Sequence, residues 1–272
     1  MKVLVTGGTG HLGRAIVACL REREHDVRVL ARRPGDGDSV EWFRGDLSTG
    51  AGVEDAVAGV DAVVHAATNS PAAQRGGFTL VDFVRSPKDV DVDGTKALIA
   101  AAEREDVRHF VHVSIVGLEH MARINPYARV KLAAEGVVRE SNLPWSIIRA
   151  TGFYWLLDRM LAKMARRRAL WLPADVRMQA VDSDEFAAFA VEVLDHGMGG
   201  EHPDFVGPET LTMHELAEQF LAERELELRI RSAPMPSRAK RALDAGNTSM
   251  TAIRGERTWQ QWLRSHPPAA DT

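Results

Sequence analysis

Residues 1–13 read MKVLVTGGTGHLG, in which the apolar run Val3–Val5 stands directly before three glycines spaced three apart, Gly7, Gly10 and Gly13. A helix is expected to follow, because its apolar side chains recur at helical spacing: Leu12, Ala15, Ile16, Cys19 and Leu20. Strand, glycine turn and helix in this order form the corner of a Rossmann fold where backbone amides hold a pyrophosphate. The alternative is an ordinary tight turn between a strand and a helix.

The second expected strand indicates which dinucleotide would bind. Residues 27–30 are apolar apart from Arg28 and end in Ala31-Arg32-Arg33-Pro34. This position lies about 20 residues after the last glycine, where the adenosine ribose is recognised. An acidic residue there would accept from a free 2′-hydroxyl, whereas guanidinium groups suit a 2′-phosphate. Arg32 and Arg33 therefore predict a preference for NADP(H) over NAD(H), and the alternative is that both are solvated surface charges.

Composition narrows the class of protein. The chain has 272 residues, of which 45% are hydrophobic and 26% charged, with a net charge of −4, as in ordinary globular proteins. This charge gives no sign of nucleic-acid binding, and no apolar run is long enough to span a membrane. Cys19 is the single cysteine, which excludes an internal disulfide and a cysteine-cluster metal site. We expect a cytoplasmic protein with a small-molecule substrate and no metal, and leave monomer or dimer open.

The chain alternates apolar strands with amphipathic helices through its first 150 residues, which predicts a doubly wound parallel sheet. Strands are expected at 3–5, 27–30, 40–44, 61–66, 109–114 and 143–149, and helices at 92–104 and 127–140. The predicted fold is α/β, with a Rossmann-type dinucleotide-binding domain at 1–150. Residues 151–272 are expected to form a smaller α/β lobe that binds substrate and packs on the same sheet. Helices are expected there at 152–168, 183–195 and 212–224, while 234–255 is polar and poorly patterned.

Tyr127 and Lys131 carry the expected chemistry. Asn125-Pro126 is typical of a helix start, with Asn as N-cap and Pro at the first helical position. Tyr127 and Lys131 would then lie one turn apart on one helix face. An ammonium beside a phenol favours the phenolate, so Lys131 is expected to lower the pKa of Tyr127 toward neutrality. Such a tyrosine can exchange a proton with a carbonyl oxygen while hydride moves at the adjacent carbon.

Several motifs together resemble the short-chain dehydrogenase/reductase superfamily. The two that define it here are TGGTGHLG at 6–13 and YARVK at 127–131. Details that resemble its atypical, NmrA-like branch of NAD(P)-binding proteins are RRP at 32–34, GDL at 45–47, HAA at 65–67, DGT at 93–95, SIVG at 114–117 and LPWSIIR at 143–149. The resemblance covers residues 1–155 densely and the remainder loosely.

The resemblance implies roles for individual residues. Tyr127 would be the general acid/base, and Lys131 would also hold the nicotinamide ribose. Ser114, thirteen residues before Tyr127, would bond the substrate carbonyl; the alternative is a serine that caps its own turn. The expected cofactor-binding residues are Gly7, Thr9, Gly10, Leu12, Gly13, Arg32, Arg33, Asp46, Leu47, Ala66, Ala67 and Lys131. Among these, Arg32 and Arg33 would hold the 2′-phosphate, and Asp46 and Leu47 would contact adenine.

One position departs from the pattern. The residue before Val92 is Asp91, where the superfamily often has an asparagine that supports the lysine through water. The expected function is an NADPH-dependent reductase of a small, largely apolar carbonyl or quinone-like compound. Alternatives are a non-catalytic NADP(H)-binding redox sensor or regulator, and a non-redox epimerase or dehydratase. The role of the long loop at 68–88 is not defined by its sequence.

Overall fold

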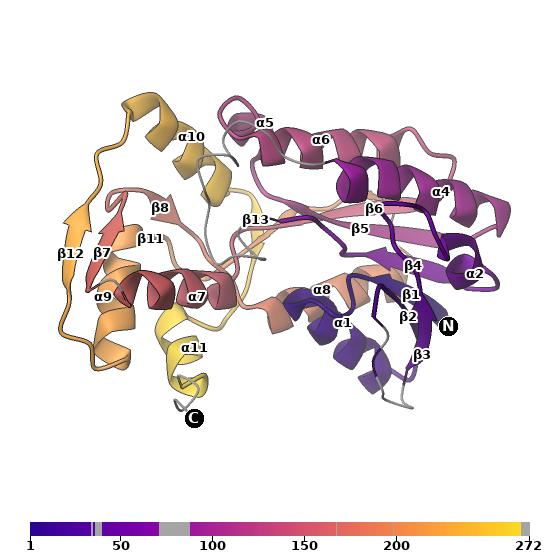
Figure 1. Ribbon diagram of the computed structural model, residues 1–272, viewed down its shortest axis with the longest axis horizontal. Helices are drawn as coiled ribbons and strands as arrows, with labels where there is room; N and C mark the ends of the chain where they lie inside the picture. The colour runs from indigo at the N-terminus through magenta and orange to yellow at the C-terminus, as the bar shows by residue number, and fades with distance from the viewer. Residues whose placement is uncertain (34, 36–39, 71–87, 167, 198, 268–272) are drawn as a thin grey trace.

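The computed structural model describes residues 1–33, 35, 40–70, 88–166, 168–197 and 199–267. Within these ranges its centre is a nine-stranded sheet, entirely parallel, with the order β13-β10-β6-β5-β4-β1-β2-β3 and β9 paired to β6 (Figure 1). The strands are β1 (Lys2–Thr6), β2 (Asp26–Ala31), β3 (Glu41–Arg44), β4 (Ala62–His65), β5 (His109–Ile115), β6 (Trp145–Ala150), β9 (Gly200–Glu201), β10 (Asp204–Val206) and β13 (Ala252–Arg254). The predicted doubly wound Rossmann-type sheet is confirmed.

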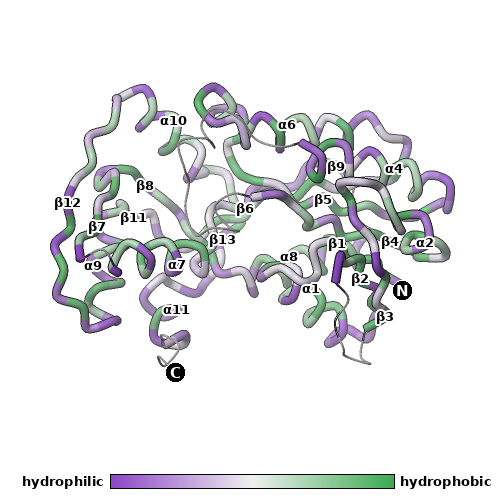
Figure 2. The backbone as a smooth tube through the Cα atoms, viewed as in Figure 1, coloured by the Kyte–Doolittle hydropathy of each residue, from purple (hydrophilic) through white to green (hydrophobic). Residues whose placement is uncertain are grey.

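Helices cover both faces of this sheet, as the parallel arrangement requires (Figure 1). One face carries α1 (His11–Glu22) and α8 (Ser183–His196) over a core of valines from β1 and β2. The other carries α2 (Val53–Val57), α4 (Gly94–Arg104) and α6 (Pro126–Arg139). A π-helical turn, η2 (Asp89–Asp93), leads into α4, and α5 (Leu118–Met121) follows β5. Figure 2 shows hydrophobic and hydrophilic residues alternating along the outer helices, as amphipathic packing predicts.

A second group of elements forms the lobe drawn at the left of Figure 1. It holds α7 (Tyr154–Ala165), α9 (Met213–Glu223) and α11 (Trp259–Ser265), with the parallel pair β7 (Ala169–Leu172) and β12 (Arg229–Ser232) and the antiparallel pair β8 (Arg177–Met178) and β11 (Leu211–Thr212). Thr212 and Thr258 each form a capping box, which fixes where α9 and α11 begin. Trp259 is fully buried at the centre of this lobe.

The chain after residue 150 divides between the two parts. The main sheet takes up β9, β10 and β13 and is covered by α8. The lobe is built from the remaining segments, which lie before, between and after these elements. The polar segment 234–255 is also more regular than its sequence predicts. It contains α10 (Ser237–Asn247) and β13, and Gly246 of α10 packs so closely on Gly117 that a Cβ on Gly117 would overlap it. The polarity of α10 reflects its position on the surface, where it buries little of itself.

Candidate functional site

The glycine turn between β1 and α1 packs so closely on neighbouring backbone that side chains would not fit there. Gly7 has φ +75°, and a Cβ there would lie 2.7 Å from the backbone nitrogen of Ala67. A Cβ on Gly13 would overlap the Gly7 carbonyl oxygen. Gly10 is the N-cap of α1, and among the described residues no side chain caps that end. The first amides of α1 are therefore available to an anion, as expected for a pyrophosphate.

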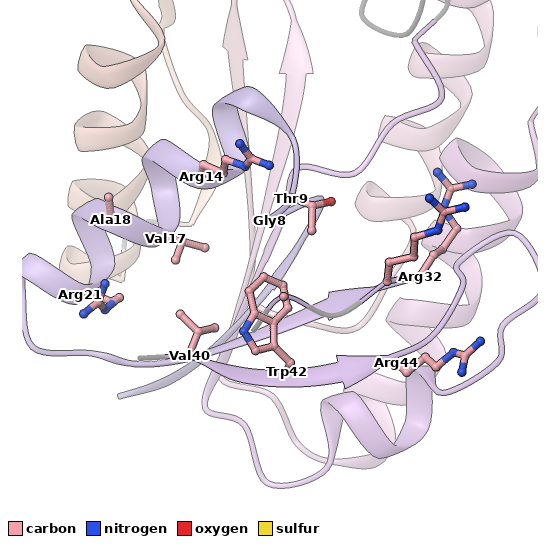
Figure 3. Close-up of a pocket in the computed structure, with 12 residues that line it drawn as sticks. Gly8, Thr9, Arg14, Val17, Ala18, Arg21, Arg32, Val40, Trp42 and Arg44 are labelled. Carbon is pink, nitrogen blue, oxygen red and sulfur yellow. The ribbon is translucent and has the colours of Figure 1, made fainter. Parts of the chain in front are cut away.

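A cavity of about 1000 Å³ opens beside this turn, between α1 and the ends of β2 and β3 (Figure 3). Exposed arginines line it: Arg14, Arg21, Arg32, Arg33 and Arg44. Gly8, Thr9, Val17, Ala18, Gly35, Val40 and Trp42 complete the lining. The cavity thus joins Thr9, Arg32 and Arg33, as predicted, to Arg14, Arg44 and Trp42, which sequence reasoning missed. The one available signal was that Arg14 directly follows the last glycine of the motif.

Asp46 and Leu47, the two residues expected to contact adenine, have different surroundings. Asp46 accepts from the backbone nitrogen and the hydroxyl of Ser48, at 2.9 and 2.7 Å, and these bonds hold the pKa of its carboxyl below its usual value. Leu47 is buried in the core, and it packs so closely on Gly94 that a Cβ added to Gly94 would lie 2.9 Å from the Leu47 Cβ. The Leu47 side chain is therefore committed to packing, and the adenine contact stays a prediction.

Tyr127 and Lys131 are placed by the start of α6. The Asn125 side chain accepts from the Tyr127 nitrogen at 2.9 Å, and Pro126 occupies the first helical position, as predicted. Both functional side chains are buried, with Tyr127 8% and Lys131 2% exposed. Lys131 donates to the Val113 carbonyl oxygen at 3.1 Å, which anchors α6 to β5 beneath the site.

A chain of polar contacts joins the two through Asp91 of η2. The Tyr127 hydroxyl lies 2.8 Å from Thr68 Oγ1, and Thr68 Oγ1 donates to Asp91 Oδ1 at 2.7 Å. Lys131 Nζ is 3.7 Å from that same carboxylate oxygen, while the Asn69 nitrogen donates to Oδ2 at 2.9 Å. Thr68 directly follows Ala67, whose backbone contacts the glycine turn. The tyrosine hydroxyl therefore lies at the end of the sheet that carries the phosphate-binding corner.

The expected effect of Lys131 on Tyr127 is wrong for this structure. Burial, followed by the Asp91 charge, raises the pKa of Tyr127 well above its usual value. The physical reason is that the Lys131 ammonium is paired with Asp91, so its charge does not act on the phenol alone.

Ser114 is the last residue but one of β5 and faces Glu135 of α6. It is 3% exposed, and its hydroxyl lies toward Glu135 without, among the described residues, forming a hydrogen bond of ordinary geometry. Glu135 is itself fully buried and accepts from Arg149 at 2.8 and 2.7 Å and from Arg139 at 2.8 Å. The contacts of the described residues thus join Tyr127 to Lys131 but not to Ser114.

Buried histidines support the floor of the site in their neutral form. His65 Nδ1 lies 2.6 Å from Thr6 Oγ1 and Nε2 lies 2.9 Å from Thr95 Oγ1. Burial, with a smaller contribution from Lys131, lowers the pKa of His65 to about 3. His112 is equally buried, and its pKa is also well below the usual value. The His65 ring joins the ends of β1 and β4 to α4, and neither ring adds charge next to Lys131.

Of the three aromatic residues that follow β6, Phe153 and Tyr154 pack in the core and Trp155 lies next to the glycine turn. Phe153 packs on Phe186 of α8, and Tyr154 is buried against Trp259 with its hydroxyl donating to the Arg257 carbonyl at 3.0 Å. Trp155 instead stacks on His11 of the glycine turn, with ring centroids 4.7 Å apart. The lobe therefore reaches the phosphate-binding turn through Trp155.

The sequence matches a model of NAD(P)H-binding proteins over residues 7–197. The chain belongs to this NAD(P)H-binding family. A solved short-chain dehydrogenase/reductase superfamily protein from Agrobacterium tumefaciens, with bound NAD, has the same fold, with a TM-score of 0.73 at 23% identity and coverage of 97% of this chain and 95% of that one. The predicted Rossmann-type fold and NAD(P) binding are thus confirmed.

Two curated relatives differ in what their names describe. A "(4-alkanoyl-5-oxo-2,5-dihydrofuran-3-yl)methyl phosphate reductase" from Streptomyces griseus is 31% identical over 229 residues, covering 80% of this chain and 72% of the relative. A "Photosystem II assembly factor Ycf39" from Trieres chinensis is 33% identical over 159 residues, covering 57% of this chain and 46% of the relative. The chain spans about half the length of the first curated relatives it matches, 46% and 59%.

Membrane-spanning helices and metal-binding clusters are both absent from the described part of the chain. None of the described helices has the length and apolar character needed to cross a bilayer. The described residues likewise contain no group of three or more histidine, cysteine, aspartate or glutamate side chains placed to hold a metal ion.

Proposed function

We propose that this protein is an NADPH-dependent reductase that reduces a small, largely apolar carbonyl or quinone-like compound. The observation that carries the proposal is the buried Tyr127–Thr68–Asp91–Lys131 arrangement at the end of the sheet that bears the glycine turn. A structural role alone does not require a phenol and an ammonium buried together beside a nucleotide-binding corner. The Streptomyces relative, which is named a reductase, supports the same class of reaction.

The cofactor preference is proposed from the arginine-lined cavity. A bound dinucleotide supplies the hydride, and its 2′-phosphate would carry two negative charges into a cavity bordered by five guanidinium groups. Arg32 and Arg33 come from the end of β2, and Arg14 comes from the first turn of α1. Guanidinium forks bind phosphate oxygens through paired hydrogen bonds, which a free 2′-hydroxyl cannot exploit. Binding of NADPH should therefore be favoured over NADH.

The chain's own residues would handle the proton. Tyr127 gives its hydroxyl proton to the carbonyl oxygen while the carbonyl carbon accepts hydride, so that C=O becomes CH–OH. The phenolate left on Tyr127 then takes a proton from solvent. Lys131 offsets negative charge beside the phenolate, and the buried Ser114 hydroxyl is the proposed donor to the carbonyl oxygen. The lobe would contribute the apolar substrate wall through Trp155.

A second candidate is a regulator that binds NADP(H) without turnover. The observation that favours it is that the Tyr127 hydroxyl is buried and hydrogen-bonded to Thr68 rather than open to a substrate. The similarity to a photosystem assembly factor is compatible with such a role. The cytoplasmic location expected from the sequence stays a prediction under either proposal.

One experiment separates these functions. Purified protein is incubated with NADPH and a panel of aldehydes, ketones, enones and quinones, and cofactor oxidation is followed by absorbance. Turnover with a stoichiometric alcohol or hydroquinone product supports the reductase. Tight cofactor binding without turnover on any class contradicts it and favours the regulator. Substrate conversion without net cofactor oxidation would indicate epimerisation or dehydration.

A further inference from the structure

Asp91 stands where the superfamily often has an asparagine, and the expected superfamily roles assign nothing to Thr68. Asp91 contacts Lys131, and Thr68 contacts Tyr127. We propose that they are positioning residues: Asp91 orients the Thr68 hydroxyl, and Thr68 in turn holds the Tyr127 hydroxyl and connects it to solvent. This inference rests on the proposed reductase function and specifies how its acid is set up. It follows from the donors and acceptors of three side chains and from their burial.

The direction of each hydrogen bond can be worked out from the number of protons available. A carboxylate has no proton to donate, so Thr68 must donate its single hydroxyl proton to Asp91 Oδ1, 2.7 Å away. Thr68 Oγ1 is also 2.8 Å from the Tyr127 hydroxyl oxygen, and with its proton already used it can only accept. Tyr127 is therefore the donor, and the proton it would give to a substrate points at Thr68 in this state.

Asp91, Thr68 and Tyr127 differ in how far they are exposed to solvent. Asp91 is 1% exposed and Tyr127 is 8% exposed, whereas Thr68 is exposed. A proton from solvent can thus reach the buried phenol through the Thr68 hydroxyl. Release of the Tyr127 proton to a substrate requires only rotation about the phenolic C–O bond, because Thr68 can then turn its own proton toward the phenolate.

The charged and titratable groups around Tyr127 determine whether its phenol stays protonated. η2 presents Asp91, and the helix of Tyr127 itself presents Lys131, which is paired with that carboxylate. His65 of β4 and His112 of β5 face Lys131, and burial keeps both neutral near pH 7. The nearby acid on α5, Glu119, pairs with Arg149. Burial and the Asp91 charge both favour the protonated phenol, so Tyr127 is set up to act as an acid.

The test uses the fact that the chain has only two tyrosines, Tyr127 and Tyr154. In a Tyr154→Phe background, phenolate formation at Tyr127 is followed by ultraviolet difference absorbance during a pH titration, with no substrate present. Asp91→Asn is compared with Asp93→Asn, which removes the same charge from an exposed position on the same π-helical turn. We expect Asp91→Asn to move Tyr127 ionisation at least one pH unit lower, a tenfold change in phenolate at fixed pH, and Asp93→Asn to leave it unchanged. Equal curves for the two variants would overturn the role of Asp91.

Thr68 supplies a second variant that does not depend on a buried substitution. Thr68→Val keeps the shape of an exposed side chain and removes its hydroxyl, and Thr68→Ser restores it. On any substrate the wild type reduces, kcat should fall on the order of tenfold in Thr68→Val with KM unchanged, and recover in Thr68→Ser. Equal kcat in all three proteins would refute the role of Thr68. If the ionisation shift is found but Tyr127→Phe retains full turnover, the positioning contacts stand and the proposed catalytic function fails.

Discussion

Replacing Arg32 with alanine should remove most of the discrimination between NADPH and NADH. Arg32 leaves the end of β2 and lines the cavity beside the glycine turn, together with Arg14 and Arg33. A hydrogen bond between charged partners contributes about 1.5–3 kcal/mol. Because Arg32 is exposed, solvent screens its charge, and we take the lower end, about 1.5 kcal/mol, which corresponds to a change of about tenfold in Kd.

The assay is calorimetric or fluorescence titration of both cofactors with the wild type and with Arg32→Ala. The wild type should bind NADPH at least about tenfold more tightly than NADH, and the variant should lose most of that ratio through weaker NADPH binding. Arg108→Ala is the matched control, because it removes an exposed arginine that pairs with Asp61, away from the cavity lining. Raising the salt concentration should shrink the wild-type ratio, since exposed charges are screened. Equal wild-type affinities for the two cofactors would refute the reasoning.

Two further outcomes follow from the packing around the site. Gly13→Ala should abolish cofactor binding or destabilise the protein, because its Cβ would overlap the Gly7 carbonyl oxygen; retention of wild-type cofactor Kd and melting temperature would contradict this. Glu135→Ala should cost about 1.5–3 kcal/mol of unfolding free energy at pH 7, because the partly buried Arg149 loses its charge-assisted hydrogen bonds to Glu135. Burial alone would raise the pKa of Glu135, but its interactions with Arg149, Ser114 and Arg139 together outweigh burial and hold this pKa below the usual 4.5. The contribution of Glu135 to stability is therefore present above that pH and is lost as the pH falls further. Urea unfolding at pH 7 and pH 3 should therefore show a smaller pH dependence for Glu135→Ala than for the wild type, and parallel losses would contradict the linkage.

The regular elements of the first 150 residues were predictable because local signals and tertiary packing agree there. The apolar run of β1 is buried on both sheet faces, and the Asn125-Pro126 signal places the start of α6 correctly. The return of the chain to the main sheet was not predictable in the same way. β10 and β13 are three residues each, and their places, β10 beside β6 and β13 beside β10, are decided by contacts between residues far apart in sequence.

The candidate site was predictable in its residue types but not in its connections. Spacing along a helix indicates that Tyr127 and Lys131 share a face, and the structure brings both to the expected end of the sheet. Helical spacing does not predict that Asp91 and Thr68 lie between the Tyr127 hydroxyl and the Lys131 ammonium, because Asp91 and Thr68 belong to other segments of the chain. Together with burial, the Asp91 charge raises the pKa of Tyr127, whereas the sequence predicted that Lys131 would lower it.

The measurement that tests the central proposal most directly is the turnover of Tyr127→Phe. The substitution removes one hydroxyl and keeps the buried ring, so the cofactor Kd should stay within about twofold of the wild type. With any carbonyl or quinone that the wild type reduces, kcat should fall by about 10²–10⁴, the usual contribution of a positioned acid. Turnover equal to the wild type, with cofactor binding intact, would contradict the proposal that Tyr127 is the proton donor.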